Sequence, residues 1–107
     1  VSSGNSFVHE TESQVILNGS YNINFTMDLV LKDTGLFDEL AKKLNAPLEI
    51  SPKVVEIFND GKKKYGSRAW SSMIVKRMED LNNIDLRAEG FPDELVDNEP
   101  EEKGYEI

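Results

Sequence analysis

The sequence contains no cysteine, which excludes disulfide bonds and thiolate metal sites and leaves the redox compartment open. No apolar run approaches the roughly 18 residues that a membrane-spanning helix needs, and no charged-then-apolar leader stands at the start. No two glycines are separated by a single residue, so a GxGxxG dinucleotide-binding fingerprint is absent. No serine lies in a GxSxG elbow, and the single histidine, His9, has no partner at metal-ligand spacing. We therefore predict no catalytic residue and no metal site within this chain.

Net charge is small everywhere except at the C-terminal end. Residues 84–107 carry nine acidic side chains against two basic ones, and this excess accounts for most of the net charge of −8. The remainder of the chain is close to neutral and favours neither polyanions nor cations as ligands, whereas the acidic C-terminal end argues against binding to nucleic acid. Because residues 84–107 also lack helical periodicity and are interrupted by Gly and Pro, we predict an extended acidic tail there.

The rest of the chain has helical periodicity and little that is typical of strands. Its 107 residues suffice for one domain with a modest core. Apolar residues at three- and four-residue steps predict helices over about 7–17, 24–44, 51–65 and 67–81. The short connections between these segments imply antiparallel neighbours. We predict an all-α fold, a compact antiparallel bundle of about four helices in residues 1–83, followed by the tail 84–107.

Polar residues mark where the helices should begin and end. Small polar side chains suited to capping precede each helix, and glycine, an Asn-Ala-Pro turn or, after the last helix, Asn82-Asn83 follows. The candidate N-caps are Ser6, Asn24 or Thr26, Ser51 (with Pro52 after it) and Ser67, while Gly19 suits a left-handed C-cap.

The second helix is the one around which the others are organised. Apolar residues from Leu29 to Leu44 form a stripe that we expect to be one buried face. Lys32 lies on the border of that stripe, about one turn from Leu36, where its ammonium could enter a cleft. From spacing alone, a surface lysine whose stem packs on the stripe is the more typical interpretation. Gly35 costs about 1 kcal/mol relative to Ala in mid-helix, and either a closely packed neighbouring backbone or simple drift would explain its presence.

Three other groups of residues are candidates for binding or chemistry. Lys62–Lys64 is typical of a solvated helix end, with a phosphate-binding patch as the alternative. Trp70 and Met73 have the spacing of core residues or of an interface face. The carboxylate pair Glu79/Asp80 is expected at exposed helix positions, without the desolvation that acid–base catalysis would need.

Residues 24–48 resemble the C-terminal helical domain of the β-hydroxyacid dehydrogenases, a family that includes 3-hydroxyisobutyrate dehydrogenase, tartronate semialdehyde reductase and relatives of 6-phosphogluconate dehydrogenase. The family pattern is a Phe at a helix start, then Leu-x-x-Lys-Asp, then a turn. Ser2–Ser6 and Gly66 to Ser71 fit the same pattern, so that the resemblance covers roughly residues 1–81. It is carried here by Phe25, Leu29-Val30-Leu31-Lys32-Asp33, Glu39-Leu40-Ala41 and Leu44-Asn45-Ala46-Pro47-Leu48.

The resemblance implies a parent enzyme with a Rossmann domain that binds NAD or NADP. A long helix would join that domain to this one, and the cleft between them would hold a small hydroxyacid. The family's catalytic lysine lies on the long helix, before Val1. Lys32 would reach the cofactor and the cleft, and Phe25 would help to wall it, so the resemblance favours a functional role for Lys32.

Further expectations follow from the same resemblance. The chain begins at Val1 without an initiator Met, and we expect a piece of a longer protein that folds but is inactive and holds no cofactor alone. Expected partners are the Rossmann domain of the same parent, a small hydroxyacid and a second subunit in a homodimer or larger oligomer, with no nucleic acid and no membrane. The expected location is the cytoplasm. The competing hypothesis is a free-standing helical protein-interaction module, in which the Trp70 face and the acidic tail bind a protein.

Overall fold

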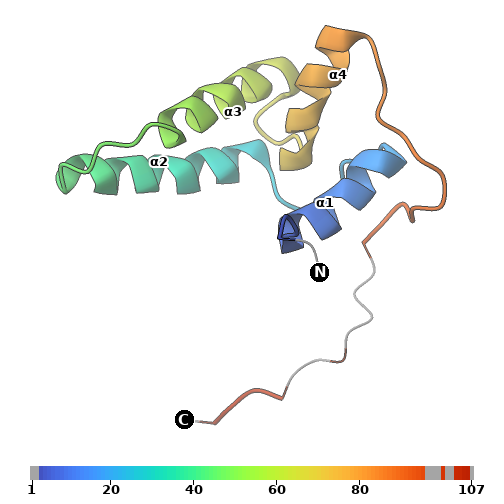
Figure 1. Ribbon diagram of the computed structural model, residues 1–107, viewed down its shortest axis with the longest axis horizontal. Coiled ribbons are helices and arrows are strands. Elements are labelled where there is room, and N and C mark those ends of the chain that lie inside the picture. The colour runs from blue at the N-terminus through green and yellow to red at the C-terminus, as the bar shows by residue number, and fades with distance from the viewer. Residues whose placement is uncertain (1–2, 96–99, 101–102, 107) are drawn as a thin grey trace.

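The computed structural model describes residues 3–95, 100 and 103–106. These residues form α-helices α1 (Phe7–Asn18), α2 (Met27–Lys43), α3 (Ser51–Tyr65) and α4 (Lys76–Asn82), with the 3-10 helix η1 (Ser71–Val75) leading directly into α4. Within the described residues no strand forms, and the one β-bridge joins Thr26 to Trp70. The prediction of an all-α fold with four α-helices is confirmed (Figure 1).

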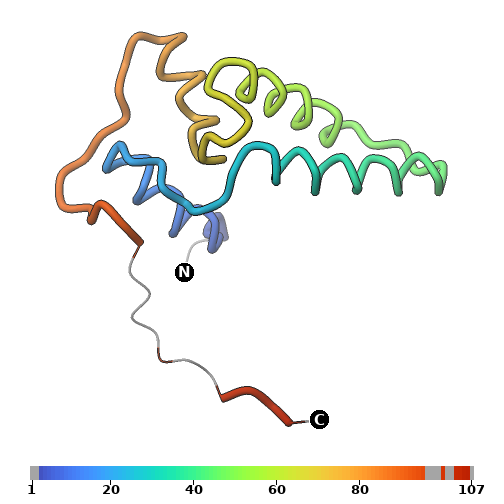
Figure 2. The backbone as a smooth tube through the Cα atoms, turned by 180° about the vertical axis from the view of Figure 1, so that it is seen from behind, coloured from blue at the N-terminus to red at the C-terminus, as the bar shows by residue number. Residues whose placement is uncertain are grey.

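Helices α2 and α3 form an antiparallel hairpin. Helices α1 and α4 lie at the open end of this hairpin, where α2 begins and α3 ends (Figures 1 and 2). Met27 and Ala41 of α2 are buried, as is Gly61 of α3. A Cβ atom at Gly61 would lie 2.8 Å from Ile74 Cδ1 and 3.1 Å from Met27 Sδ. The absence of a side chain at Gly61 therefore lets α3 approach both α2 and η1 closely.

The apolar stripe of α2 is only partly buried, which corrects the expectation of one continuous buried face. Four large side chains in the second half of α2 and directly after it are more than half exposed: Leu36 (58%), Phe37 (55%), Leu40 (54%) and Leu44 (68%). Helix α3 covers instead the side of α2 that carries Met27 and Ala41. We call the four exposed residues the α2 strip.

Gly35 lies in open space, so a closely packed neighbour, one of the two explanations considered for this glycine, is wrong. A Cβ atom at Gly35 would meet no neighbouring atom within 4 Å, whereas Gly61 is tightly enclosed. We expect Gly35→Ala to raise the free energy of unfolding by about 0.5–1 kcal/mol through helix propensity. The matched Gly61→Ala gains the same propensity but crowds Ile74 and Met27, so its free energy of unfolding falls below that of Gly35→Ala. Urea denaturation compares the two variants, and equal stabilisation by both would contradict the close packing at Gly61.

Helix α1 begins and ends where its capping residues predict. The Ser6 hydroxyl accepts a hydrogen bond from the His9 backbone N–H at 3.1 Å, and Gly19 follows the helix with φ +83°. A φ in this range favours glycine because it has no Cβ. His9 is exposed, as expected of a surface histidine.

The other predicted caps are only partly right. Thr26 precedes α2, but its hydroxyl donates to the Asp28 carboxylate and caps no backbone N–H. Ser51 is the first residue of α3, and its hydroxyl donates to Asp38 across the hairpin. Ser67 does not start the last helix, because residues 67–70 are held by the start of α2 and helical structure resumes only at Ser71.

The segment after α4 is extended and lies along α1 (Figure 1). The Ala88 backbone N–H donates to the Leu17 carbonyl at 3.0 Å, and the Asn18 side chain donates to the Pro92 carbonyl. The first part of the predicted tail therefore contacts the helices. Residues 96–99, 101–102 and 107 of that tail lie outside the described residues.

Candidate functional site

The start of α2, which carries Phe25 and Lys32, is fixed by the segment that precedes η1. The Met27 N–H donates to the Ala69 carbonyl at 2.9 Å, and the Asp28 N–H donates to the Ser67 carbonyl at 3.1 Å. The first N–H groups of a helix have no partner within it, and here the chain between α3 and η1 supplies two acceptors. The loop is anchored in return, because the Ser71 N–H donates to the Phe25 carbonyl at 2.7 Å.

Lys32 projects from the solvent side of α2. Its side chain is 61% exposed, and Nζ lies 3.2 Å from Oδ1 of Asp33, which is itself 58% exposed. At about 100° per residue, Lys32 points roughly opposite to the buried Ala41. Lys32 does lie at the border of the apolar stripe, but that part of the stripe is the exposed α2 strip. Its ammonium is therefore available to a group outside this chain.

Phe25 immediately precedes α2 and has its backbone held by Ser71. Its side chain is 37% exposed, whereas the next two residues, Thr26 and Met27, are buried. Phe25 and Lys32 thus share the first part of α2, with Phe25 at its entrance and Lys32 in its second turn. Both are accessible to an external ligand.

A second ion pair involves Asp28, which lies between Phe25 and Lys32 in the sequence. Arg68 Nη1 is 3.4 Å from Oδ2 of Asp28, about one turn before Lys32. The hydrogen bond from the Thr26 hydroxyl, together with the nearby Arg68, holds the pKa of Asp28 below its ordinary value. Asp28 is therefore a carboxylate at neutral pH, and the two pairs leave the start of α2 with balanced charge.

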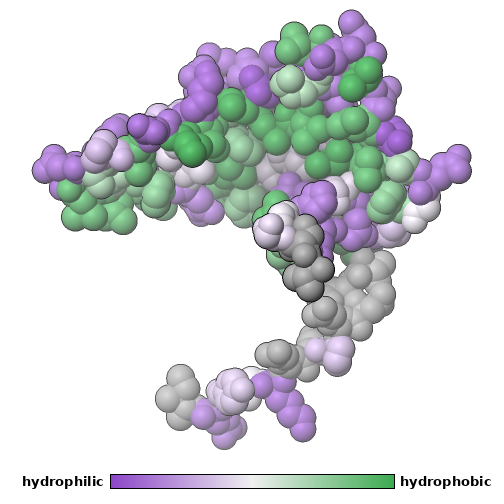
Figure 3. All heavy atoms as spheres, viewed as in Figure 1, coloured by the Kyte–Doolittle hydropathy of each residue, from purple (hydrophilic) through white to green (hydrophobic). Residues whose placement is uncertain are grey.

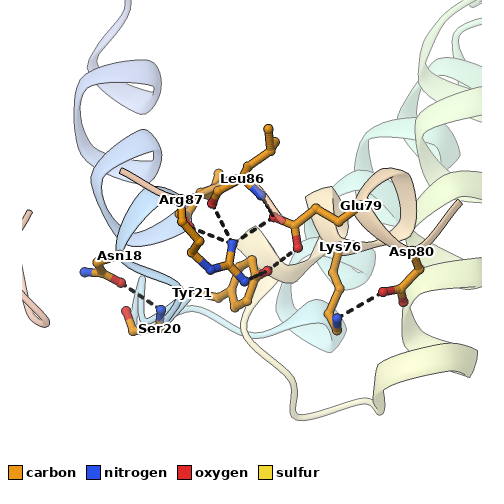
Figure 4. Close-up of polar contacts among 9 residues, drawn as sticks. Asn18, Ser20, Tyr21, Lys76, Glu79, Asp80, Leu86 and Arg87 are labelled. Carbon is orange, nitrogen blue, oxygen red and sulfur yellow. Dashed lines mark hydrogen bonds and ion pairs between the residues drawn. The ribbon is translucent and has the colours of Figure 1, made fainter. Parts of the chain in front are cut away.

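The structure also reveals a buried cluster that sequence reasoning missed. Glu79 is 1% exposed, so the expectation that both carboxylates of the Glu79/Asp80 pair are exposed is wrong for Glu79. Asp80 is exposed, as expected. The Glu79 carboxylate accepts hydrogen bonds from the Tyr21 hydroxyl (2.5 Å), Arg87 Nη1 (2.9 Å) and the Leu86 backbone N–H (3.2 Å). Figure 4 shows these groups converging from the turn after α1, from α4 and from the segment after α4. No local pattern in the sequence signals this cluster, because its members are up to 66 residues apart.

Arg87 joins the segment after α4 to the rest of the cluster. Its Nη2 donates to the Tyr21 hydroxyl at 2.9 Å, and its guanidinium lies 5.3 Å from the centre of the Tyr21 ring. The Tyr21 backbone is fixed as well, since its carbonyl accepts the buried Ser72 hydroxyl at 2.6 Å. The polar groups of this cluster hydrogen-bond to one another and thereby join distant segments of the fold. We therefore assign the cluster a structural role and no catalytic one.

Because Glu79 is buried and hydrogen-bonded as a carboxylate, we expect the fold to lose stability in acid. Burial alone would raise the pKa of Glu79, but the hydrogen bonds from Tyr21, Arg87 and the Leu86 N–H lower it below its ordinary value of 4.5. The unfolded chain therefore takes up this proton at higher pH than the folded chain. The resulting stability is fully present above pH 4.5 and is lost as the pH falls through the folded pKa.

Glu79→Gln isolates this effect from the other carboxylates whose pKa values are also lowered, namely the half-buried Asp28 and Asp60 and the exposed Asp80. We expect the free energy of unfolding of Glu79→Gln to depend less steeply on pH below 4.5 than that of the unsubstituted chain. Urea denaturation at several acidic pH values measures both slopes. Identical slopes would show that Glu79 has an ordinary pKa.

The remaining candidates from the sequence are ordinary parts of the fold. Lys62–Lys64 is exposed in the last turn of α3, and Lys64 pairs with Asp60 at 3.2 Å. Trp70 and Met73 are half-buried within a single chain. Among the described residues, no group of His, Cys, Asp and Glu is arranged to hold a metal ion, and no helix is long and apolar enough to cross a membrane.

Most of the helical region is similar in sequence to known proteins. The family model described as "NAD-binding of NADP-dependent 3-hydroxyisobutyrate dehydrogenase" matches residues 1–78. The 2-(hydroxymethyl)glutarate dehydrogenase of Eubacterium barkeri is 31% identical over 86 residues, which are 79% of this chain and 29% of that protein. The chain therefore spans less than a third of the length of this curated relative. No solved structure matches.

Proposed function

Because the chain belongs to the NADP-dependent 3-hydroxyisobutyrate dehydrogenase family, we propose that it is the helical domain of a cytoplasmic NAD- or NADP-dependent dehydrogenase of small hydroxyacids. The observation that carries this proposal is the family match over residues 1–78, which includes the Lys32-Asp33 motif on α2. The similarity to a dehydrogenase of 2-(hydroxymethyl)glutarate supports a hydroxyacid as the substrate class.

The described residues can contribute only part of a dinucleotide site. They form helices and no sheet, so they offer no Rossmann strand-turn-helix for the pyrophosphate. The side chains that fit a cofactor are Lys32 and Phe25, an exposed ammonium and a partly exposed ring on the same stretch of chain. In this proposal the Rossmann domain of the parent binds the dinucleotide, and α2 supplies one side of the cleft.

Lys32 would act by its charge. A nicotinamide cofactor supplies the acceptor for the hydride that leaves the hydroxyl-bearing carbon. The Lys32 ammonium, held on a rigid helix, stabilises the negative charge of the substrate carboxylate and of groups near the reacting carbon. Its attraction strengthens when a second domain covers it and excludes water, because the local dielectric constant falls. The Phe25 ring would contribute an apolar wall to the same cleft.

The protein-interaction module has less support. It would need Trp70 as an exposed docking residue, but Trp70 is half-buried and its backbone forms a bridge with Thr26. A contact between subunits of the parent remains part of the proposal, with the helical domain providing it.

The test is an assay of the parent enzyme produced from its natural reading frame. We expect it to oxidise a small hydroxyacid with NAD or NADP, followed by nicotinamide absorbance, with 3-hydroxyisobutyrate and 2-(hydroxymethyl)glutarate as the first substrates. The 107-residue chain alone should fold, as judged by circular dichroism, and give no turnover. A parent that oxidises no small hydroxyacid would overturn the proposed substrate class, and turnover by the isolated chain would overturn the proposed role of the Rossmann domain.

A further inference from the structure

We infer that Arg68 binds a second carboxylate of the substrate, so that the parent enzyme selects hydroxyacids with two carboxylates. This inference rests on the proposed function, in which Lys32 faces the cleft, and it narrows the substrate class. The Arg68 side chain is 80% exposed, and Nη1 lies 3.4 Å from Oδ2 of Asp28. Asp28 and Lys32 are four residues apart on α2, so their side chains lie on the same face. Asp28 therefore holds the guanidinium on the side of α2 from which the Lys32 ammonium projects.

The backbone around Arg68 is fixed on both sides. The residue before it, Ser67, accepts a hydrogen bond from the Asp28 N–H at 3.1 Å, and the residue after it, Ala69, accepts one from the Met27 N–H at 2.9 Å. These bonds tie the segment directly to the first turn of α2. Preorganisation of this kind favours ligand binding, because less conformational freedom is lost when the ligand arrives.

The Arg68 guanidinium keeps most of its donors for a ligand. A guanidinium has five N–H donors, whereas Arg68 has one partner within the described residues, Asp28. Asp28 is oriented without Arg68, because its Oδ1 accepts hydrogen bonds from the Thr26 hydroxyl and from the Leu29 N–H. The planar guanidinium matches a carboxylate, which arginine binds through two parallel hydrogen bonds. Arg68 can therefore bind a substrate carboxylate while it stays paired with Asp28.

The neighbouring surface of α2 explains why a doubly charged substrate would need this second cation. Leu36 lies about 40° around the helix from Lys32, so the α2 strip belongs to the same side of α2. Figure 3 shows apolar surface along the outer edge of the hairpin of α2 and α3. A cleft closed over apolar surface excludes water, and a carboxylate without a cation is unstable there. Lys32 compensates one carboxylate, and Arg68 compensates the other.

The experiment compares two substrates of the parent enzyme that share their reacting end. 2-(Hydroxymethyl)glutarate and 3-hydroxyisobutyrate both carry a hydroxymethyl group and a carboxylate on one carbon, but the first has a carboxyethyl group where the second has a methyl group. We expect the unsubstituted enzyme to prefer the diacid. Arg68→Ala should lower kcat/KM for the diacid by about ten- to hundredfold, the loss of a charge-assisted contact, and leave that for 3-hydroxyisobutyrate within about threefold. 2-(Hydroxymethyl)pentanoate, with an uncharged propyl group, separates charge from size and should be as insensitive to Arg68→Ala as 3-hydroxyisobutyrate.

Two further variants control for charge and for geometry. Lys53→Ala removes an exposed, ion-paired cation near the start of α3, at the opposite end of the hairpin, and should leave kcat/KM for both acids unchanged. Arg68→Lys keeps the charge without the planar donors and should retain only part of the preference for the diacid. Circular dichroism and urea denaturation verify that both Arg68 variants fold, as expected for a side chain that is 80% exposed.

A binding measurement does not depend on turnover. Glutarate carries both carboxylates but no hydroxyl group, and its affinity for the parent enzyme can be measured by titration calorimetry. Arg68→Ala should weaken glutarate binding by about tenfold and leave butyrate binding unchanged.

Three results would contradict the inference: a parent that prefers 3-hydroxyisobutyrate to the diacid, equal losses for both acids in Arg68→Ala, or a rise in the KM for the dinucleotide alone. The last result would assign Arg68 to a cofactor phosphate. All three leave the proposed function intact, because the enzyme still oxidises a small hydroxyacid. A parent that oxidises no small hydroxyacid would instead contradict the proposed function, and equal glutarate binding by the unsubstituted enzyme and Arg68→Ala would then exclude the carboxylate site as well.

Discussion

Replacing Arg87 by alanine is expected to lower the free energy of unfolding by about 3 kcal/mol. The reason is the buried Glu79 carboxylate, 1% exposed, which would lose the only cation that contacts it within the described residues. The Tyr21 ring would also lose its contact with the guanidinium. Urea denaturation measures the change, and the segment after α4, which Arg87 joins to α1, should become more accessible to hydrogen exchange.

Two controls separate this effect from the loss of any surface charge. Lys76→Ala removes an exposed ion pair to Asp80 beside the cluster, at 3.0 Å, and should cost less than about 1 kcal/mol. In a Glu79→Gln background, Arg87→Ala should cost less than in the unsubstituted chain, because a neutral amide needs no cation. Equal costs in both backgrounds would mean that Arg87 stabilises the fold by some route other than Glu79.

Lys32→Ala in the parent enzyme is expected to lower kcat/KM for the hydroxyacid by about ten- to hundredfold. This range corresponds to the loss of one charge-assisted contact, about 1.5–3 kcal/mol. The stability of the chain should hardly change, because Lys32 is 61% exposed and, among the residues that the structure describes, forms an ion pair only with Asp33. Steady-state kinetics with varied cofactor and varied hydroxyacid would show whether the loss is larger for one of the two substrates.

Lys42→Ala is the matched control for this prediction. It removes the same charge from the same helix, near the C-terminal end of α2 and outside the Lys32-Asp33 motif. We expect its kcat/KM to remain close to that of the unsubstituted enzyme. If Lys32→Ala and Lys42→Ala have the same kinetics, Lys32 does not belong to the active-site cleft.

The course of the helices follows closely from the sequence because short-range chemistry controls it. Ser6 and Gly19 delimit α1, and the Lys32 stretch forms a helix whose start lies within three residues of the expected one. Capping, helix propensity and apolar spacing depend on residues that are close in the sequence, so the sequence alone is enough to predict their effects. The predicted start of the last helix is wrong because residues 67–70 hydrogen-bond to the start of α2, an arrangement that no local pattern encodes.

The candidate site divides in the same way. The resemblance in sequence identified Phe25 and Lys32, and the fold adds only that both are accessible. Glu79, in contrast, looked like an exposed acid beside Asp80. Its burial depends on Tyr21 and Arg87, which approach it from distant parts of the chain.

The sequence by itself determined the helical class, most helix ends and the position of the Lys32-Asp33 motif. Only the tertiary structure decided which side of α2 is covered, leaving Leu36 and Leu40 exposed where their spacing suggested a core. The physical reason is that apolar periodicity records which residues of a helix should leave water, but it does not record what covers them. The covering surface is α3 on one side of α2, and on the other side this chain provides none among its described residues.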